Sequence, residues 1–221
     1  MSKGETLREL QFGESGVDHR RVIRSGMAQA ELFASASELP EGFDYRDDFI
    51  SAEEEQHLVG AIQQLQFEKI RMHGVVAKRR TVQFGQRYGF ETFKLSEAPP
   101  IPEFLLPLSE RVGEFARCDA RRLEEVLVTE YAAGAQIGWH RDAPAFDIVI
   151  GVSLLGECTM KFRPWPATQP AATRATRVKA LSQILAPRSV YILRGSARSK
   201  WQHHIPPTKT LRYSITFRTL R

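Results

Sequence analysis

The second half of the chain alternates between short apolar runs and turn residues, and this alternation restricts the possible folds most. The runs start near Glu124 and include IVIGVSLL, CTMKFRPW, SVYILRG and LRYSITFRTL. Apolar runs of about four to eight residues bounded by turns predict β-strands. Many short strands that follow initial helices predict a β-sandwich or barrel with helices packed outside. The expected fold class is therefore mainly β with flanking helices.

The first half predicts two helices and an extension. In SAEEEQHLVGAIQQLQF, Ser51 and Glu54 fit a capping box, and apolar residues follow at helical spacing: Leu58, Ile62 and Leu65. APPIPEFLLPLSERVGEFA predicts a Pro-rich loop and then a helix near residues 102–116. Residues 1–38 are charged and weakly periodic, which predicts a partly flexible extension before one domain over 39–221. Residues 166–180, rich in Pro, Ala and Thr, predict an exposed loop.

Composition excludes several classes of protein. The two cysteines, Cys118 and Cys158, form no CxxC pair, so neither a disulfide framework nor a cysteine-based zinc site is expected. The N-terminus lacks the apolar segment of a signal peptide, and the longest apolar run, residues 148–155, is too short to span a bilayer. We therefore expect a soluble, cytoplasmic monomer. The net charge of +5 favours polyanionic partners.

The segment GWHRD places His140 two residues before Asp142. On an extended chain, residues i and i+2 point the same way, so both side chains can face one metal ion. A third ligand is available in WQHHIPP, at His203 or His204. Two imidazoles and one carboxylate form the facial triad of non-haem Fe(II) oxygenases, and zinc is the chemical competitor. The alternative is a surface pair of His140 and Asp142 with incidental histidines elsewhere.

The segment RYSITFR separates polar from apolar residues on a predicted strand. Its polar residues share one face: Arg212, Ser214, Thr216 and Arg218. A sheet exposed on one side alternates in the same way, so an ordinary surface strand is the alternative. Two arginines on one face nevertheless suit a dicarboxylate, because a guanidinium binds a carboxylate through a bidentate, charge-assisted fork.

Taken in order, EYAAGAQIGWHRD, WQHHIPP and RYSITFR resemble the AlkB-type Fe(II)/2-oxoglutarate dioxygenases, with similarity from about Phe43 to Arg221. The resemblance implies a double-stranded β-helix (jelly roll) and the cofactors Fe(II), 2-oxoglutarate and O2. It implies three iron ligands, His140, Asp142 and His203, with His203 preferred over His204 because the ligand of the family stands two residues before an apolar position.

The same resemblance implies how 2-oxoglutarate is bound. Arg212 would pair with its distal carboxylate, and Arg218 would lie beside its keto-acid end. Tyr131 would donate a hydrogen bond to it, and Ser214 lies on the same face of the strand as both arginines. Thr129 stands where the family often has asparagine.

The resemblance also implies the reaction and the substrate class. 2-Oxoglutarate would be decarboxylated to succinate and CO2 while a substrate C–H is hydroxylated, and an N-methyl group would leave as formaldehyde. AKRRTVQFGQRYGFETF interleaves basic residues that can hold phosphates with rings that can stack a base, although an ordinary hairpin has the same composition. We predict substrate contacts at Arg80, Phe84 and Tyr88. The expected partner is single-stranded DNA or RNA with alkylated bases, and the expected role is DNA or RNA repair.

One departure keeps other substrates open. Bacterial DNA-repair relatives often carry another acidic residue after the metal aspartate, whereas this chain has Ala143 and Pro144 and no acid before Asp147. The same chemistry on tRNA or on protein side chains is therefore an alternative. A non-catalytic jelly-roll binding module that uses the three ligand residues structurally is the alternative from another class. Arg198 is expected to hold a turn near His203.

Overall fold

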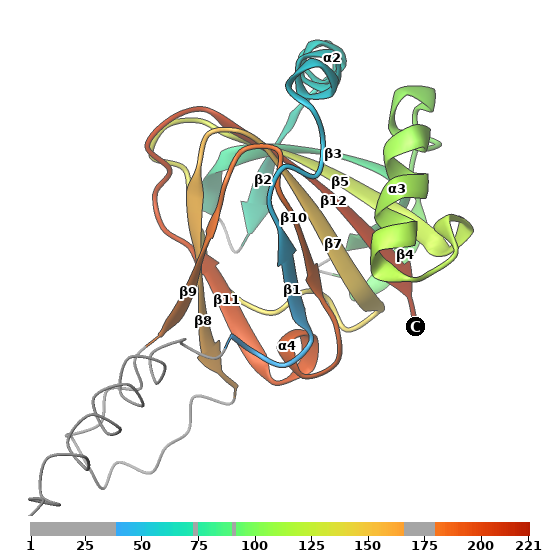
Figure 1. Ribbon diagram of the computed structural model, residues 1–221. Helices are drawn as coiled ribbons and strands as arrows, with labels where there is room; N and C mark the ends of the chain where they lie inside the picture. Colours follow the sequence, from blue (N-terminus) through green and yellow to red (C-terminus); the bar gives the residue numbers. More distant parts are fainter. Residues whose placement is uncertain (1–38, 73–74, 90–91, 166–179) are drawn as a thin grey trace, which may run out of the picture. The chain divides into compact units, whose positions relative to one another are not determined.

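The computed structural model describes residues 39–72, 75–89, 92–165 and 180–221 (Figure 1). The predicted extension over residues 1–38 lies outside the described residues, as does the predicted loop over 166–180 except for its last residue. Among the described residues, no helix combines the length and the apolarity that crossing a bilayer would require.

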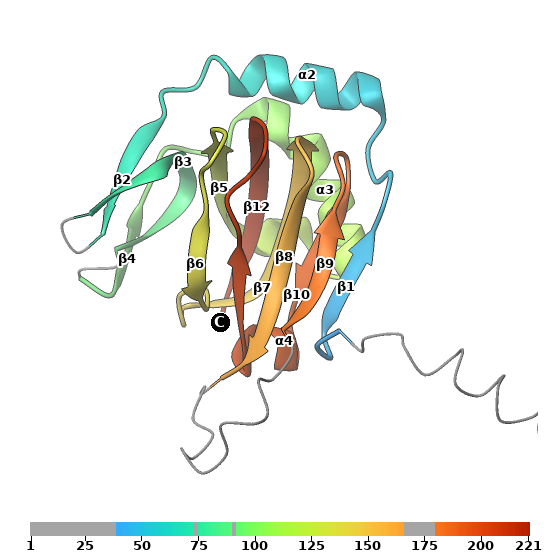
Figure 2. The same ribbon diagram turned by 90° about the vertical axis from the view of Figure 1, so that its left-hand side faces the viewer.

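Within the described residues the strands form two antiparallel sheets, which face each other in Figure 2. The major sheet has the order β1 (Phe43–Arg46), β10 (Val190–Leu193), β7 (Phe146–Leu155), β12 (Arg212–Leu220), β5 (Leu123–Tyr131), β3 (Val75–Gly89) and β2 (Glu68–Met72), and β4 (Lys94–Glu97) pairs with β3. The minor sheet has the order β6 (Ile137–His140), β11 (Trp201–Ile205), β8 (Cys158–Pro164) and β9 (Leu181–Leu185). The predicted mainly β class is confirmed.

The two longer helices, α2 (Ala52–Ile62) and α3 (Leu106–Ala116), pack on the same hydrophobic core, and α3 lies on the side of the major sheet that faces away from the minor sheet (Figure 1). The short turns are η1 (Glu103–Leu105), η2 (Ala120–Arg122) and α4 (Gly195–Ser199), and Ala197 of α4 packs in the core between the two sheets. The predicted capping box is present: Glu54 N donates to Ser51 Oγ at 3.1 Å, and Ser51 N donates to Glu54 Oε2 at 2.8 Å. The second predicted helix starts later than expected, because the residues just after Pro102 form η1.

The central strand β12 is buried on both faces. It pairs with β5 on one side and with β7 on the other. Its apolar residues Ile215 and Phe217 join the core beneath the helices. Its polar residues point the other way, into the space between the two sheets, and they are buried too. The strand therefore carries a row of polar groups inside the molecule, unlike the surface strand that has the same pattern.

Gly151 of β7 makes room for the ring of Tyr191 of β10, because a Cβ atom at Gly151 would overlap that ring. We expect Gly151→Ala to lower the free energy of unfolding by about 1–3 kcal/mol, as overpacking usually does. Gly60→Ala in α2 is the control, since nothing lies within 4 Å of its Cβ position. Alanine should stabilise this helix by about 0.5–1 kcal/mol. Urea denaturation followed by circular dichroism measures both, and stability changes of the same sign would contradict the packing argument.

Candidate metal centre

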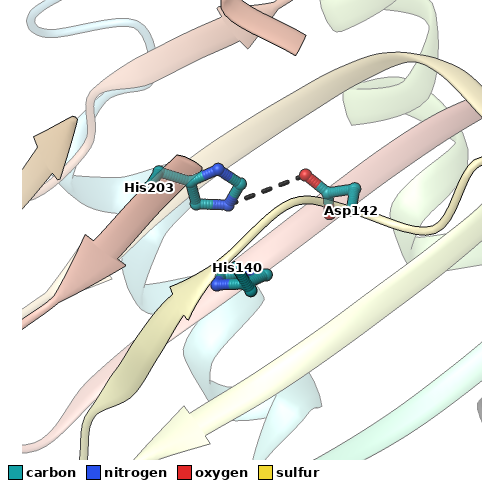
Figure 3. Close-up of side chains that lie close together, drawn as sticks. All are labelled: His140, Asp142 and His203. Carbon is teal, nitrogen blue, oxygen red and sulfur yellow. Dashed lines mark ion pairs between the residues drawn. The ribbon is translucent and has the colours of Figure 1, made fainter. Parts of the chain in front are cut away.

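Two paired strands bring the three predicted iron ligands together (Figure 3). His140 ends β6, and it lies directly opposite His203 in the antiparallel pair with β11. Their ring centroids are 4.2 Å apart. Asp142 follows β6, and its Oδ2 lies 3.6 Å from Nε2 of His203. The potential ligand atoms of the three residues all lie within 4.8 Å of one another, which is the spacing of a metal site.

The pairing of β6 with β11 also decides between His203 and His204, the two candidates for the third ligand in the motif WQHHIPP. His203 points into the space between the sheets, and the strand alternation turns His204 to the other face. There His204 Nδ1 lies 2.6 Å from the carbonyl oxygen of Ile137, and its ring lies 5.1 Å from that of Trp139. Of the two candidates, the structure brings His203 to the cluster.

The surroundings of the cluster favour the protonation states that bind a metal. Burial lowers the pKa of His140, and burial together with the neighbouring His140 lowers the pKa of His203 to about 3. Both imidazoles are therefore neutral near pH 7, as metal ligands must be. His140 Nδ1 lies 2.9 Å from the carbonyl oxygen of Gly138, and a hydrogen bond there leaves Nε2 free for a metal.

Asp142 is ionised. Burial raises the pKa of this carboxyl, but Arg218 and the other neighbouring basic groups together outweigh burial and hold the pKa well below its usual range. One oxygen, Oδ1, accepts a hydrogen bond from Arg218 at 3.0 Å. The other oxygen, Oδ2, is buried without a hydrogen-bond partner among the described residues. A divalent cation would satisfy this oxygen, so the donor set fits Fe(II).

A second set of unsatisfied groups fits the predicted 2-oxoglutarate. The side chain of Arg212 is fully buried, and its Nε donates to Ser153 Oγ at 3.1 Å. Its two terminal nitrogens have no hydrogen-bond partner among the described residues. A buried guanidinium with unpaired N–H groups is unfavourable, and a carboxylate accepts both of them in a bidentate fork. Arg212 therefore fits the far carboxylate of a dicarboxylic acid.

The other predicted cosubstrate residues share this inner face. Tyr131 lies opposite Arg212 across the β5–β12 pair, with its ring 4.9 Å from the guanidinium carbon, and burial raises the pKa of its phenol. Ser214 is buried opposite Thr129, the residue that departs from the family pattern. Arg218 lies at the metal end of the row, where it contacts Asp142.

The structure does not bring two of the three predicted substrate contacts to the cluster. Arg80 pairs with Glu130 through two hydrogen bonds of 2.8 Å. Phe84 is part of the hydrophobic core beneath the helices. Both side chains lie on the outer face of the major sheet, because the alternation of β3 against β5 turns Arg79 inward instead. This placement corrects the prediction for Arg80 and Phe84.

Tyr88, the third predicted contact, is on the metal side of the sheet. It packs in a small buried cluster with Ala143 and Phe146. The ring of Phe146 in turn lies 5.2 Å from the guanidinium carbon of Arg218. Tyr88 thus packs beside the residue that follows Asp142, and its contact with a substrate stays a prediction.

The structure adds residues near the metal that the sequence reasoning did not select. Arg79 lies on the inner face, one residue before the first pair of β3 with β5, and its Nη1 donates to the carbonyl oxygen of Gln136 at 3.4 Å. Glu125 is buried on the same face and pairs with Arg218. Glu125 could have been found from strand parity, because it lies an even number of residues from Tyr131, which faces Arg212. Arg79 could not, because the inner face of β3 depends on its register with β5.

Arg198 holds the chain that follows the metal aspartate, in line with its expected role in a turn. Its Nη2 donates to the carbonyl oxygen of Phe146 at 3.0 Å and also to that of Ala143. Trp201 packs against the inner core, whereas Trp139 lies on the outer face of the minor sheet beneath the guanidinium of Arg163. These contacts are structural ones.

Comparisons with known proteins agree with this geometry. The family model described as the 2OG-Fe(II) oxygenase superfamily matches residues 34–218. The alkylated DNA repair protein ALKBH8 homolog of Arabidopsis thaliana is 30% identical over 179 residues, which cover 73% of this chain and 50% of the relative. This chain thus spans about half the length of that relative. The probable RNA/DNA demethylase ALKBH6 of Danio rerio is 26% identical over 171 residues, covering 76% of this chain and 70% of the relative.

A solved structure, that of OsALKBH1, superposes with a TM-score of 0.60 at 17% identity. The superposition covers 82% of this chain and 98% of the other, and at this identity it shows the shared fold. The predicted jelly-roll class is thereby confirmed, and the superfamily implies Fe(II), 2-oxoglutarate and O2 as cofactors. From the His140–Asp142–His203 cluster, the unsatisfied Arg212 and the match of the family model, we conclude that the chain belongs to the 2OG-Fe(II) oxygenase superfamily.

Proposed function

We propose that this dioxygenase removes methyl groups oxidatively from alkylated bases in single-stranded DNA or RNA. Two relatives support the proposal through their names, one as an alkylated DNA repair protein and one as a probable RNA/DNA demethylase. The observation that carries it to this chain is Arg79. This cation faces the same inner space as His140 and Tyr131, where it is placed to meet a phosphate or a base carbonyl.

His140, Asp142 and His203 would hold the iron, and Arg212 would hold the far carboxylate of 2-oxoglutarate. When bound, iron and 2-oxoglutarate supply the oxidation of a substrate C–H by O2, with succinate and CO2 as coproducts. The protein contributes position and exclusion of water. Arg212 fixes the orientation of the cosubstrate, the neutral histidines keep their lone pairs available, and Tyr88 with Phe146 makes one wall of the site apolar.

Mass spectrometry of methylated oligonucleotides tests this proposal. The enzyme is incubated with Fe(II), 2-oxoglutarate and single-stranded DNA or RNA that contains 1-methyladenine or 3-methylcytosine. We expect loss of the methyl group together with formaldehyde and succinate. Succinate formation without demethylation of any oligonucleotide would overturn the proposed substrate and leave the oxygenase chemistry standing.

One observation favours the same chemistry on tRNA or on a protein side chain. The residue after the metal aspartate is Ala143, which is buried against Tyr88 and Phe146 and offers no acid for reading a base. Binding assays at two salt concentrations separate a nucleic-acid substrate from a protein substrate. Affinity for a nucleic acid falls steeply with salt because the phosphates release counterions, whereas a neutral protein segment gives little change.

A further inference from the structure

A buried carboxylate lies behind the metal cluster. Glu125 of β5 is 1% exposed, in the space between the two sheets. Its Oε2 accepts a hydrogen bond from Nη1 of Arg218 at 2.8 Å. Its Oε1 accepts one from the side-chain amide of Gln83 at 3.1 Å. Burying a charged group is unfavourable unless it is paired, so this carboxylate needs both partners.

Arg218 connects Glu125 to the metal cluster. Its other terminal nitrogen, Nη2, donates to Asp142 Oδ1 at 3.0 Å. The guanidinium therefore lies between two carboxylates and gives one nitrogen to each. Burial lowers the pKa of Arg218, but Glu125 and Asp142 outweigh burial and raise that pKa above its usual value, so Arg218 remains charged.

This arrangement leaves one of the two carboxylate oxygens of Asp142 available to a metal ion. An arginine and a carboxylate alone prefer a bidentate pair, in which two nitrogens each donate a hydrogen bond to one of the two oxygens. Here Glu125 takes Nη1, so the fork of the two terminal nitrogens is not available to Asp142. Asp142 Oδ2 stays without a hydrogen-bond partner among the described residues. Glu125 also offsets the charge of Arg218, so the three groups together keep one net negative charge for a cation.

We propose that Glu125 is a positioning residue for the metal centre. It holds Arg218 away from a bidentate pair with Asp142, so that Asp142 presents one free oxygen and its full charge to the metal. Gln83 of β3 fixes the second oxygen of Glu125. Loss of an outer partner of a metal ligand typically weakens metal affinity by about 10- to 100-fold, which is the size of effect expected here.

Co(II) binding to the metal-free protein tests the proposal without any substrate or turnover. Co(II) is titrated anaerobically into the wild type, Glu125→Gln and Glu124→Gln, and the dissociation constant is read from the visible absorption of the bound ion. We expect Glu125→Gln to bind Co(II) about 10-fold more weakly or worse. Glu124→Gln is the matched control, because the adjacent Glu124 is exposed and the same substitution should leave binding unchanged.

Thermal unfolding of the same metal-free variants separates positioning from a general role in stability. A purely structural role predicts a lower melting temperature for Glu125→Gln with unchanged Co(II) affinity in the folded protein, and that result would overturn the proposal. Gln83→Ala gives a second arm if Glu125→Gln fails to fold. It keeps the charge of Glu125 but removes one donor, so Co(II) binding should weaken by less than 10-fold, and unchanged binding would count against the proposal. None of these results depends on which substrate the enzyme demethylates.

Discussion

His203→Ala should lose 2-oxoglutarate-dependent succinate formation down to background, whereas His204→Ala should keep it. The two histidines are adjacent residues of β11, so the two substitutions remove the same side chain from the same strand. His203 lies in the cluster with His140 and Asp142, and His204 lies on the opposite face against Trp139. Removing one of three ligands should exceed the about 10- to 100-fold loss caused by removing an outer partner.

Succinate is measured in the presence of Fe(II), 2-oxoglutarate and O2, first without and then with a methylated oligonucleotide. Co(II) titration of both variants gives a reading that does not depend on turnover. If His204→Ala lost activity and metal binding while His203→Ala kept both, the assignment of the third ligand would be wrong. If both variants lost activity and metal binding, we would assign the loss to misfolding only if their circular dichroism spectra also differed from that of the wild type.

Arg212→Met should remove most of the stabilisation that 2-oxoglutarate gives without destabilising the empty protein. In the empty protein, two buried nitrogens of Arg212 have no partner among the described residues, so removing the charge should not lower the melting temperature. With 2-oxoglutarate, loss of a buried charge pair costs about 2–5 kcal/mol, or about 30-fold to several thousand-fold in affinity.

Thermal unfolding with Mn(II) and increasing 2-oxoglutarate measures this effect without turnover. A ligand at about 100 times its dissociation constant stabilises the wild type by about 2.7 kcal/mol, which raises the melting temperature. Arg212→Met should keep at most about a third of this stabilisation at the same concentration, because the ligand is then at most about three times its weakened dissociation constant. Arg121→Met is the control, because Arg121 is exposed and pairs with Asp119, and this variant should respond as the wild type does. An equal response in both variants would remove Arg212 from the cosubstrate site.

The sequence was informative where alternation and spacing each had one physical meaning. In β12 the polar and apolar residues separate strictly, and the structure places them on opposite faces. The i and i+2 spacing of His140 and Asp142 similarly put both side chains near one point. What the pattern could not give was that both faces of β12 are buried, because burial of a polar face depends on the minor sheet packing over it.

The predicted substrate contacts on β3 were wrong for a related reason. Alternation shows that Arg79 and Arg80 face opposite ways, but it does not tell which face is the inner one. That choice depends on the register with β5, where Arg80 lies opposite Glu130. At Gly85 the backbone takes a positive φ of 73°, and the strand changes partner from β5 to β4. Parity counted from Phe84 therefore does not extend to Tyr88.

Because both faces of β12 are buried, the number of residues in this strand matters as much as their identity. Inserting or deleting one residue in this strand would exchange its two faces along the rest of its length. Charged guanidinium groups would then enter the hydrophobic layer under α3, and Ile215 and Phe217 would fill the cosubstrate site. A library of single-codon insertions tests this constraint. Insertions of one residue should be tolerated in the connections between strands, whereas insertions between Arg212 and Arg218 should give no folded, active protein.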